Sequence, residues 1–239
     1  MPSVPKWLGD TLEKLSSKYY HAVTVTDVTY LNESLKKVRF EGDIKSIAFT
    51  PGQVVEFRVT DTDYRHYTPS VFDTKQKACE VIFYLHGRGI GSMWAEALEE
   101  GQQLKLIGPG GKLAYRSEFP VHLVFGDETS VGLAHCIANE CERSGSQFKG
   151  LLEFAPENIS WEIGTDDRTT VVRASMDSPA KRALEVLESW QDIYGDKVGF
   201  YLTGRAKSIQ RVRGYLLEKG VPRKHIQTEP YWAEGKRGL

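Results

Sequence analysis

The feature that most constrains the fold is a change of pattern near Pro120. Before it, short β-rich segments follow one another with turn residues between them. After it, apolar strands alternate with helical stretches. Closely spaced strands are typical of an antiparallel barrel or sandwich, whereas alternating strands and helices are typical of a parallel sheet covered by helices. The sequence therefore predicts an antiparallel β domain over residues 1–117 and an α/β domain over residues 118–239.

The elements expected in the two parts follow from residue periodicity. A helix is predicted over Leu8–Tyr20, where leucines recur at helical spacing. The strands predicted for the β domain are His21–Tyr30, Lys36–Glu41, Gln53–Thr60, Cys79–His86 and Gln103–Ile107. The strands predicted for the α/β domain are Val121–Phe125, Phe148–Phe154, Thr169–Arg173, Val198–Thr203 and His225–Thr228. Its helices are predicted at Val131–Arg143, Pro179–Tyr194 and Ser208–Lys219.

Composition excludes several classes of function. The chain has 239 residues, 40% of them hydrophobic, and its 31 Lys and Arg balance 32 Asp and Glu. Nucleic acid and anionic membranes require a basic excess, so we expect neither as a partner. Three cysteines are too few for a disulfide framework or a four-cysteine metal site. No apolar run approaches the roughly 18 residues of a membrane span. We therefore expect a cytoplasmic protein without a bound metal.

The first group of candidate functional residues is Arg65, Tyr67 and Thr68, which follow a predicted strand and turn. A guanidinium binds phosphate in a bidentate manner, an aromatic ring covers a flat heterocycle, and a hydroxyl bonds a ring nitrogen. Together these groups suit a flavin nucleotide. The alternative is an exposed arginine beside a cross-strand tyrosine, as in many antiparallel sheets.

The second group is the stretch His86–Ala95, in which Gly87, Gly89 and Gly91 alternate and Ser92 opens a predicted helix. Glycines allow close approach of the backbone, and free N–H groups at the start of a helix bind anions. These residues therefore suit a pyrophosphate. A glycine-rich turn with a serine cap explains the same pattern.

A third group, Gly126–Ser130, follows the first strand of the α/β domain. Nucleotides usually meet an α/β sheet at this point, so Asp127 and Thr129 are candidate nucleotide contacts. Helix capping by the hydroxyl groups, with acidic residues favoured by the helix dipole, is an equally good interpretation.

The fourth group, Gly204, Arg205 and Lys207, also lies between a strand and a helix. Its basic side chains are candidates for the extra phosphate of NADPH, or are simply solvated surface. Near the C-terminus, Tyr231 and Trp232 are candidates to cover a planar cofactor, or form an aromatic anchor. Residues 205–239 contain nine Lys or Arg and three Glu, which suits an anionic ligand.

Taken in order, these stretches resemble the siderophore-interacting protein family of the ferredoxin–NADP reductase superfamily over most of the chain. Arg65, Tyr67 and Thr68 fall on its Arg-x-Tyr-Thr flavin motif. The further matches are His86, Gly87, Gly91 and Trp94 on its His-Gly stretch, Gly108, Pro109 and Gly111 on its Gly-Pro-x-Gly turn, Gly126-Asp127-Glu128-Thr129, and Tyr231-Trp232. Arg205 departs from the pattern, because relatives often have Ala-Gly-Glu where this chain has Thr203-Gly204-Arg205.

The resemblance implies an FAD-binding split β-barrel, an NAD(P)H-binding α/β domain and cytoplasmic reduction of ferric siderophores. On this basis Arg65 contacts the FAD phosphate, and Tyr67 and Thr68 lie against the reactive ring as catalytic residues. The residues expected to bind FAD or NAD(P)H are Arg65, Tyr67, Thr68, His86, Gly87, Gly89, Gly91, Ser92, Trp94, Asp127, Thr129, Gly204, Arg205 and Trp232. Lys207, Lys236 and Arg237 are expected to attract an anionic siderophore.

Two alternatives remain open on the sequence. One is a reductase of the same superfamily that passes electrons from NAD(P)H to ferredoxin or flavodoxin, and a ferredoxin is also a possible electron donor or partner. The other is a binder of siderophore or nucleotide that has no electron-transfer activity.

Overall fold

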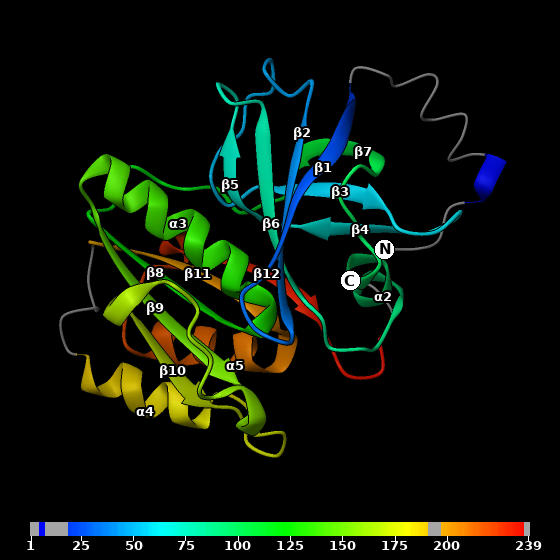
Figure 1. Ribbon diagram of the computed structural model, residues 1–239. Helices are drawn as coiled ribbons and strands as arrows, with labels where there is room; N and C mark the ends of the chain where they lie inside the picture. The colour runs from blue at the N-terminus through cyan, green and yellow to red at the C-terminus, as the bar shows by residue number, and fades with distance from the viewer. Residues whose placement is uncertain (1–4, 8–18, 191–196, 237–239) are drawn as a thin grey trace. The chain divides into compact units, whose positions relative to one another are not determined.

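The computed structural model describes residues 5–7, 19–190 and 197–236. By its internal contacts the chain divides into two compact units, Met1–Gly111 and Lys112–Arg237 (Figure 1). The helix predicted over Leu8–Tyr20 lies outside the described residues except at its end. There Tyr20 is the first residue of a strand, so the prediction is wrong at that residue.

The first unit contains a seven-stranded antiparallel sheet in the order β4-β3-β7-β1-β2-β6-β5 and the helix α2, of residues Ile90–Glu96. Its strands are β1 (Tyr20–Tyr30), β2 (Leu35–Gly42), β3 (Val54–Arg58), β4 (Tyr64–Tyr67), β5 (Pro69–Asp73), β6 (Ala78–Tyr84) and β7 (Gln103–Gly110). The predicted antiparallel β domain is confirmed.

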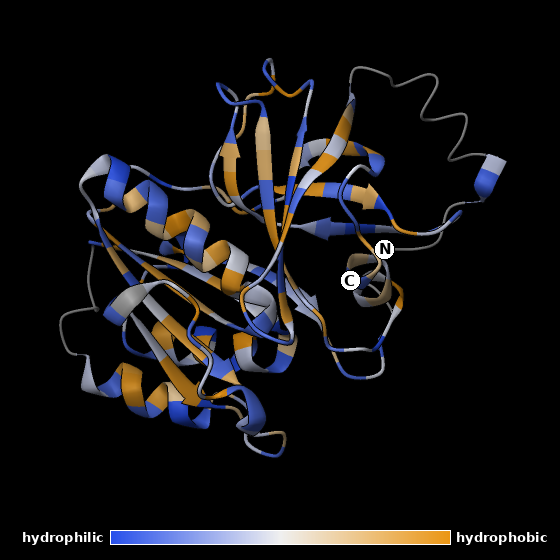
Figure 2. Cartoon of the chain, viewed as in Figure 1, coloured by the Kyte–Doolittle hydropathy of each residue, from blue (hydrophilic) through white to orange (hydrophobic). Residues whose placement is uncertain are grey.

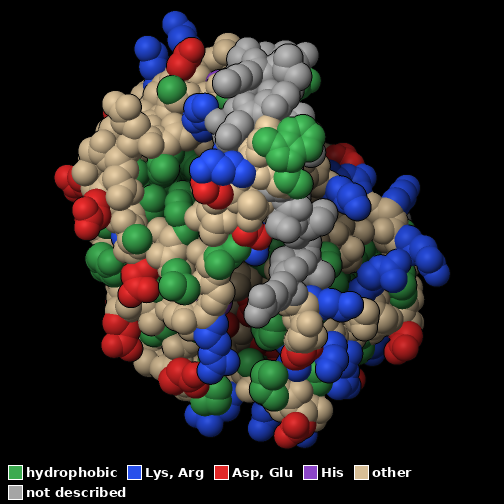
Figure 3. Space-filling view, turned by 90° about the vertical axis from the view of Figure 1, so that its right-hand side faces the viewer, with side chains coloured by type: hydrophobic (Ala, Val, Ile, Leu, Met, Phe, Trp, Pro, Cys, Tyr) green, Lys and Arg blue, Asp and Glu red, His purple; other side chains and the backbone are tan. Residues whose placement is uncertain are grey.

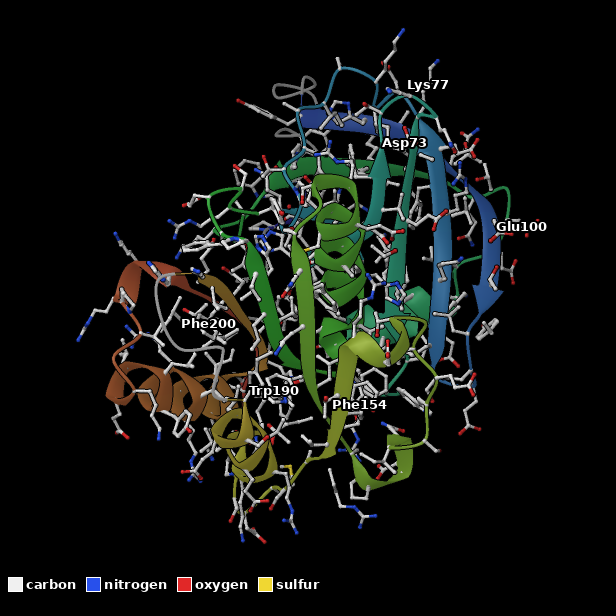
Figure 4. All side chains as sticks on the ribbon, turned by 90° about the vertical axis from the view of Figure 1, so that its left-hand side faces the viewer. Asp73, Lys77, Glu100, Phe154, Trp190 and Phe200 are labelled. Atoms are coloured by element: carbon white, nitrogen blue, oxygen red, sulfur yellow. The ribbon has the colours of Figure 1, made fainter. Side chains whose placement is uncertain are left out.

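A hairpin joins β5 to β6, and its ends Asp73 and Lys77 are labelled in Figure 4. The carboxylate of Asp73 accepts hydrogen bonds from the amides of Lys75 and Gln76, and Lys77 has a positive φ of 57°. Asp commonly bonds its own turn in this way. Asp73 therefore fixes the turn between β5 and β6, and β5 itself is not among the strands predicted from the sequence.

The second unit is a five-stranded parallel sheet in the order β10-β9-β8-β11-β12. Its strands are β8 (Val121–Asp127), β9 (Gln147–Phe154), β10 (Thr169–Arg173), β11 (Val198–Arg205) and β12 (Ile226–Trp232). Its helices are α3 (Val131–Ser144), α4 (Lys181–Ser189) and α5 (Ala206–Glu218). Figure 1 shows α3 on one face of this sheet and α4 and α5 on the other. The predicted α/β domain is confirmed.

The last strand differs from its prediction. It was expected near His225–Thr228, with the aromatic residues Tyr231 and Trp232 in a tail beyond it. Instead, β12 pairs with β11 as far as the match between Arg205 and Trp232. This pairing places the aromatic residues on the sheet, because β11 provides hydrogen-bonding partners for the backbone of β12 as far as Trp232.

The core of the second unit forms between the sheet and the helices α4 and α5. Phe200 of β11 is fully buried there with Leu187 of α4 and Val212 of α5. Trp190, which follows α4, packs against the same cluster; Trp190 and Phe200 are labelled in Figure 4. The helices carry hydrophobic and hydrophilic residues on different sides, as Figure 2 shows. This arrangement is what the helical periodicity of the sequence predicts.

A histidine is also buried in the second unit. The ring of His122, on β8, is fully buried and stacks between Tyr115 and Tyr201 at centroid distances of 4.2 and 5.9 Å. Its Nδ1 lies 3.0 Å from the Tyr201 hydroxyl. Its Nε2 has no hydrogen-bond partner among the described residues. Burial lowers the pKa of His122, because the charged imidazolium loses its hydration.

We expect His122 to make the protein less stable in mild acid. The unfolded chain takes up a proton as the pH falls below about 6.5, whereas the folded chain does not until the pH reaches its lower pKa. Between pH 7.5 and 5.5 the free energy of unfolding should fall by about 1 kcal/mol more in the wild type than in His122→Asn. Urea denaturation at the two pH values measures this difference. Equal pH slopes would mean that the histidine is not held neutral.

Candidate functional site

The predicted flavin motif lies on β4 and at the start of β5 in the first unit. Arg65 and Tyr67 are on β4, whose partner is β3, and Thr68 separates β4 from β5. Thr68 is buried, and Arg65 and Tyr67 are partly exposed. Arg65 donates to the carbonyl of Tyr64 at 2.7 Å. The ring of Tyr67 stacks on Trp94 at 5.9 Å and meets Phe83 edge-on at 4.7 Å.

The predicted pyrophosphate loop joins β6 to α2. Gly87 and Gly89 have positive φ angles of 67° and 82°, and nothing lies within 4 Å of the position that a Cβ would occupy at either residue. Side chains rarely adopt such angles, so glycine is required by the backbone at these two positions. The helix begins at Ile90 rather than at Ser92, because the chain turns into it at Gly89. The Ser92 hydroxyl instead accepts a hydrogen bond from the Gly87 amide at 3.2 Å.

The structure brings these two motifs together at Gly91. The Tyr67 hydroxyl lies 3.4 Å from the Gly91 carbonyl oxygen. A Cβ added to Gly91 would lie 2.9 Å from that hydroxyl and 3.3 Å from Cγ of Arg65. The motifs are more than twenty residues apart in the sequence, and these contacts place β4 beside the first turn of α2 within the first unit. Desolvation raises the pKa of Tyr67 and keeps its hydroxyl protonated.

His86 also belongs to this loop, immediately after β6. Its Nδ1 accepts a hydrogen bond from the Arg88 amide at 3.2 Å. Burial and the neighbouring Arg88 charge lower its pKa. The imidazole therefore helps to order the loop backbone in its neutral form, in which a ring nitrogen can accept a hydrogen bond.

In the second unit, buried carboxylates lie at the carboxyl ends of two adjacent strands. Asp127 ends β8 and Glu153 lies near the end of β9, and both side chains are buried. Burial raises the pKa of Asp127 to about 6 and also raises the pKa of Glu153. The sequence analysis missed Glu153, although the rule that ligands meet the carboxyl ends of parallel strands could have identified it.

The Asp127 carboxylate accepts hydrogen bonds from the loop that follows β8 and from β12. The Thr129 amide donates to one carboxylate oxygen at 2.9 Å, and the Trp232 indole donates to the other at 2.7 Å. At Gly204 an added Cβ would lie 2.5 Å from the Asp127 carboxylate. Asp127, Thr129, Gly204 and Trp232 therefore form one cluster at the carboxyl edge of the sheet.

Arg205 is buried beside this cluster. Its Nε donates to the Glu234 carboxylate at 2.6 Å, and its other nitrogens donate to the carbonyls of Ser175 and Met176 at 3.0 and 3.1 Å. Its guanidinium also lies over the Trp232 ring at 5.8 Å. Arg205 thus joins the segment after β10 to the segment after β12. Its guanidinium nitrogens donate to protein groups in this structure, although the sequence suggested a phosphate of NADPH as their partner.

The residues predicted to attract substrate lie at the surface where they are described. Lys207 is exposed and its Nζ is 3.6 Å from Glu234, and Lys236 is exposed near the C-terminus. Arg237 lies outside the described residues. On the face drawn in Figure 3, Lys and Arg side chains lie along the right-hand side and also at the top, in the centre and along the lower edge. In the described part of the chain, no three His, Cys, Asp or Glu side chains are grouped to hold a metal ion.

Comparison with known proteins supports the identification of the two units. Residues 46–113 match the siderophore-interacting FAD-binding domain, and residues 119–235 match the siderophore-interacting protein family. The ferric vibriobactin reductase ViuB of Vibrio cholerae serotype O1 is 25% identical over 97% of this chain and 90% of its own length.

Solved structures show the same fold. A siderophore utilization protein from T. fusca superimposes with a TM-score of 0.73 at 20% identity, covering 92% of this chain and 95% of that chain. The ferredoxin reductase in carbazole 1,9a-dioxygenase has a TM-score of 0.72 at 22% identity and covers 89% of this chain and 68% of that chain. The two matched domains and the shared fold show that this chain belongs to the siderophore-interacting protein family.

Proposed function

We propose that this protein is an FAD-dependent ferric-siderophore reductase that takes electrons from NAD(P)H. In the balanced reaction, one NAD(P)H and two Fe(III)-siderophore complexes give NAD(P)⁺, two Fe(II), two iron-free siderophores and a proton. Fe(III) prefers hard oxygen ligands, so reduction to the softer Fe(II) weakens the complex and releases the iron. Bound FAD supplies the conversion of a two-electron hydride into single electrons, which protein side chains cannot perform.

The observation that carries this proposal is the meeting of the two motifs at Gly91. The residues there fit a flavin nucleotide: the Arg65 side chain and the Tyr67 ring and hydroxyl lie beside Gly91, and the backbone before it is open at Gly87 and Gly89. In our proposal Arg65 binds an FAD phosphate, Gly87–Ser92 bind the pyrophosphate, and Tyr67 and Thr68 orient the ring. His86 and Trp94 act by ordering the loop and supporting Tyr67.

For the electron donor we propose residues 118–239 as the NAD(P)H-binding domain and residues 1–117 as the FAD-binding domain. Asp127, Thr129, Gly204 and Trp232 share one cluster at the carboxyl edge of the parallel sheet, where nucleotides usually bind. Arg205 supports that edge by linking its two flanking segments. Lys207, Lys236 and Arg237 would attract an anionic ferric siderophore through long-range charge.

We further propose that the reaction takes place in the cytoplasm. The three cysteines, Cys79, Cys136 and Cys141, are buried and form no disulfide bond, as suits a reducing compartment. Among the helices of the described residues, none has the length and apolar character needed to cross a membrane.

Steady-state turnover tests the proposal. The purified protein, saturated with FAD, is given NADPH or NADH and a ferric siderophore, and a ferrous chelator traps the Fe(II) that is released. We expect Fe(II) to form at two per NAD(P)H consumed. Faster turnover with ferredoxin or flavodoxin as acceptor would favour the superfamily alternative. Tight binding of ferric siderophore without turnover would favour a binding protein.

A substitution at Gly91 tests the flavin site more locally. In Gly91→Ala the new Cβ must displace the Tyr67 hydroxyl or Cγ of Arg65, since both lie too close to it. We expect the dissociation constant for FAD to rise about tenfold, which corresponds to about 1.4 kcal/mol. Gly110→Ala is the matched control, because nothing lies within 4 Å of a Cβ there. Equal FAD affinity of the two variants, measured by fluorescence titration, would separate Gly91 from the flavin site.

A further inference from the structure

Lys36 is a lysine on the core-facing side of β2. Residues 36, 38 and 40 of a strand share one face, and here Val38 and Phe40 on that face belong to the core of the first unit. The Lys36 side chain is only 1% exposed. A buried ammonium is costly unless it is hydrogen-bonded, and an apolar residue would continue the core face without that cost. The contacts of the ammonium group must therefore offset the cost of burying it.

The ammonium of Lys36 is directed at the C-terminal end of α2. Its Nζ donates to the carbonyls of Glu96 and Leu98, both at 2.7 Å, and lies 5.5 Å from the centre of the Tyr30 ring. The last carbonyls of a helix lack partners within the helix and carry partial negative charge. The last turn of α2, which is described throughout, contains no basic residue of its own. Lys36, on β2, supplies the positive charge and the hydrogen-bond donors for this end of the helix.

Other contacts of α2 link the helix to the loop that precedes it. Trp94 of α2 stacks on Tyr67. Ser92 of α2 accepts the hydrogen bond from Gly87, and the carbonyl of Gly91 lies beside the Tyr67 hydroxyl. Because α2 is a short helix of seven residues, a shift at its C-terminal end carries over to its first residues. The position of the loop therefore depends on the position of the helix end that Lys36 holds.

We infer that Lys36 is a positioning residue for the flavin site: by fixing the end of α2, it holds the loop Gly87–Ser92 in the geometry that binds FAD. The inference rests on the proposal that this loop binds FAD. Lys36 is given no contact with the cofactor and acts only through α2. Desolvation lowers the pKa of Lys36, and the nearby Glu96 and Glu99 oppose that effect.

The test compares two adjacent lysines of β2. Lys36→Met removes the ammonium while keeping an unbranched chain of similar length, and Lys37→Met makes the same change on the opposite face of the strand, where the side chain is partly exposed. FAD is titrated into flavin-free full-length protein at a temperature at which circular dichroism shows each variant to be folded. We expect the dissociation constant to rise about tenfold for Lys36→Met and to stay within about twofold of the wild type for Lys37→Met.

A second readout separates positioning from general stability. At saturating FAD, the visible circular dichroism of the bound flavin reports the geometry of its surroundings, and we expect it to change in Lys36→Met and not in Lys37→Met. If Lys36→Met does not fold, Lys36→Arg and Lys36→Gln replace it. Arginine keeps a charged donor, so we expect FAD affinity to decrease in the order wild type, Lys36→Arg, Lys36→Gln.

Folded Lys36 variants that bind FAD with wild-type affinity and an unchanged spectrum would overturn the inference. So would equal losses at Lys36 and Lys37, because these would point to a general effect of lost charge. Failure of the wild type itself to bind FAD would instead refute the proposed function, whatever the variants do.

Discussion

Tyr67→Ala is expected to purify with less than about a tenth of the FAD that the wild type carries. The substitution removes a ring that packs on Trp94 at 5.9 Å and on Phe83 at 4.7 Å, and it removes the hydroxyl beside Gly91. Loss of this packing should also lower the free energy of unfolding by about 2–3 kcal/mol, somewhat less than for a fully buried aromatic residue. Absorbance of the purified protein measures the FAD content, and urea denaturation measures the stability.

Tyr67→Phe is the control for this prediction, because it keeps the ring and removes only the hydroxyl. We expect it to retain most of its FAD and to lose about 1 kcal/mol of stability or less. If folded Tyr67→Ala takes up FAD to full occupancy with an unaltered flavin spectrum, the ring has no part in flavin binding.

Arg205→Ala is expected to lower the free energy of unfolding by about 2–3 kcal/mol. The Arg205 side chain is buried, and its removal takes away a donor to the Glu234 carboxylate and to the carbonyls of Ser175 and Met176. It also removes the guanidinium from its place over the Trp232 ring, so packing is lost together with the hydrogen bonds. Urea denaturation of the full chain measures the change.

Lys207→Ala provides the matched comparison, since Lys207 faces the same Glu234 carboxylate from an exposed position at 3.6 Å. Exposed pairs contribute little, so we expect a loss of less than about 0.5 kcal/mol. Similar small losses for the two variants would show that the contacts of Arg205 are dispensable. In that case a direct role in binding the nucleotide phosphate would become the better explanation of the residue.

The sequence allowed most of the fold to be predicted because its periodicity is strong. The strand at Thr169–Arg173 has the predicted bounds, and helix α3 was predicted to within one residue. The strand β4 was missed because it is only four residues long, and α2 was placed late because Gly89 starts the helix without a side-chain cap. The extent of β12 depends on pairing with β11, which is a tertiary contact that local patterns do not contain.

The candidate site was less predictable than the fold. The motif at Arg65–Thr68 and the glycine loop could each be found in the sequence, but their meeting at Gly91 depends on how β4 and α2 pack. Basic residues were treated as ligands or as surface. Arg205, one of these, is instead buried with its donors on carbonyl groups, and so is Lys36, which was predicted only as part of a strand. Composition cannot separate these roles, because burial of a charge depends on partners distant in the sequence.

An anaerobic absorption titration of the purified protein tests the central claim most directly. We predict that the protein carries FAD or takes it up, that NADPH or NADH bleaches the visible flavin absorption, and that a ferric siderophore restores it while Fe(II) appears. A folded protein that takes up no FAD, or whose bleached flavin is not restored by any ferric chelate, would contradict the account.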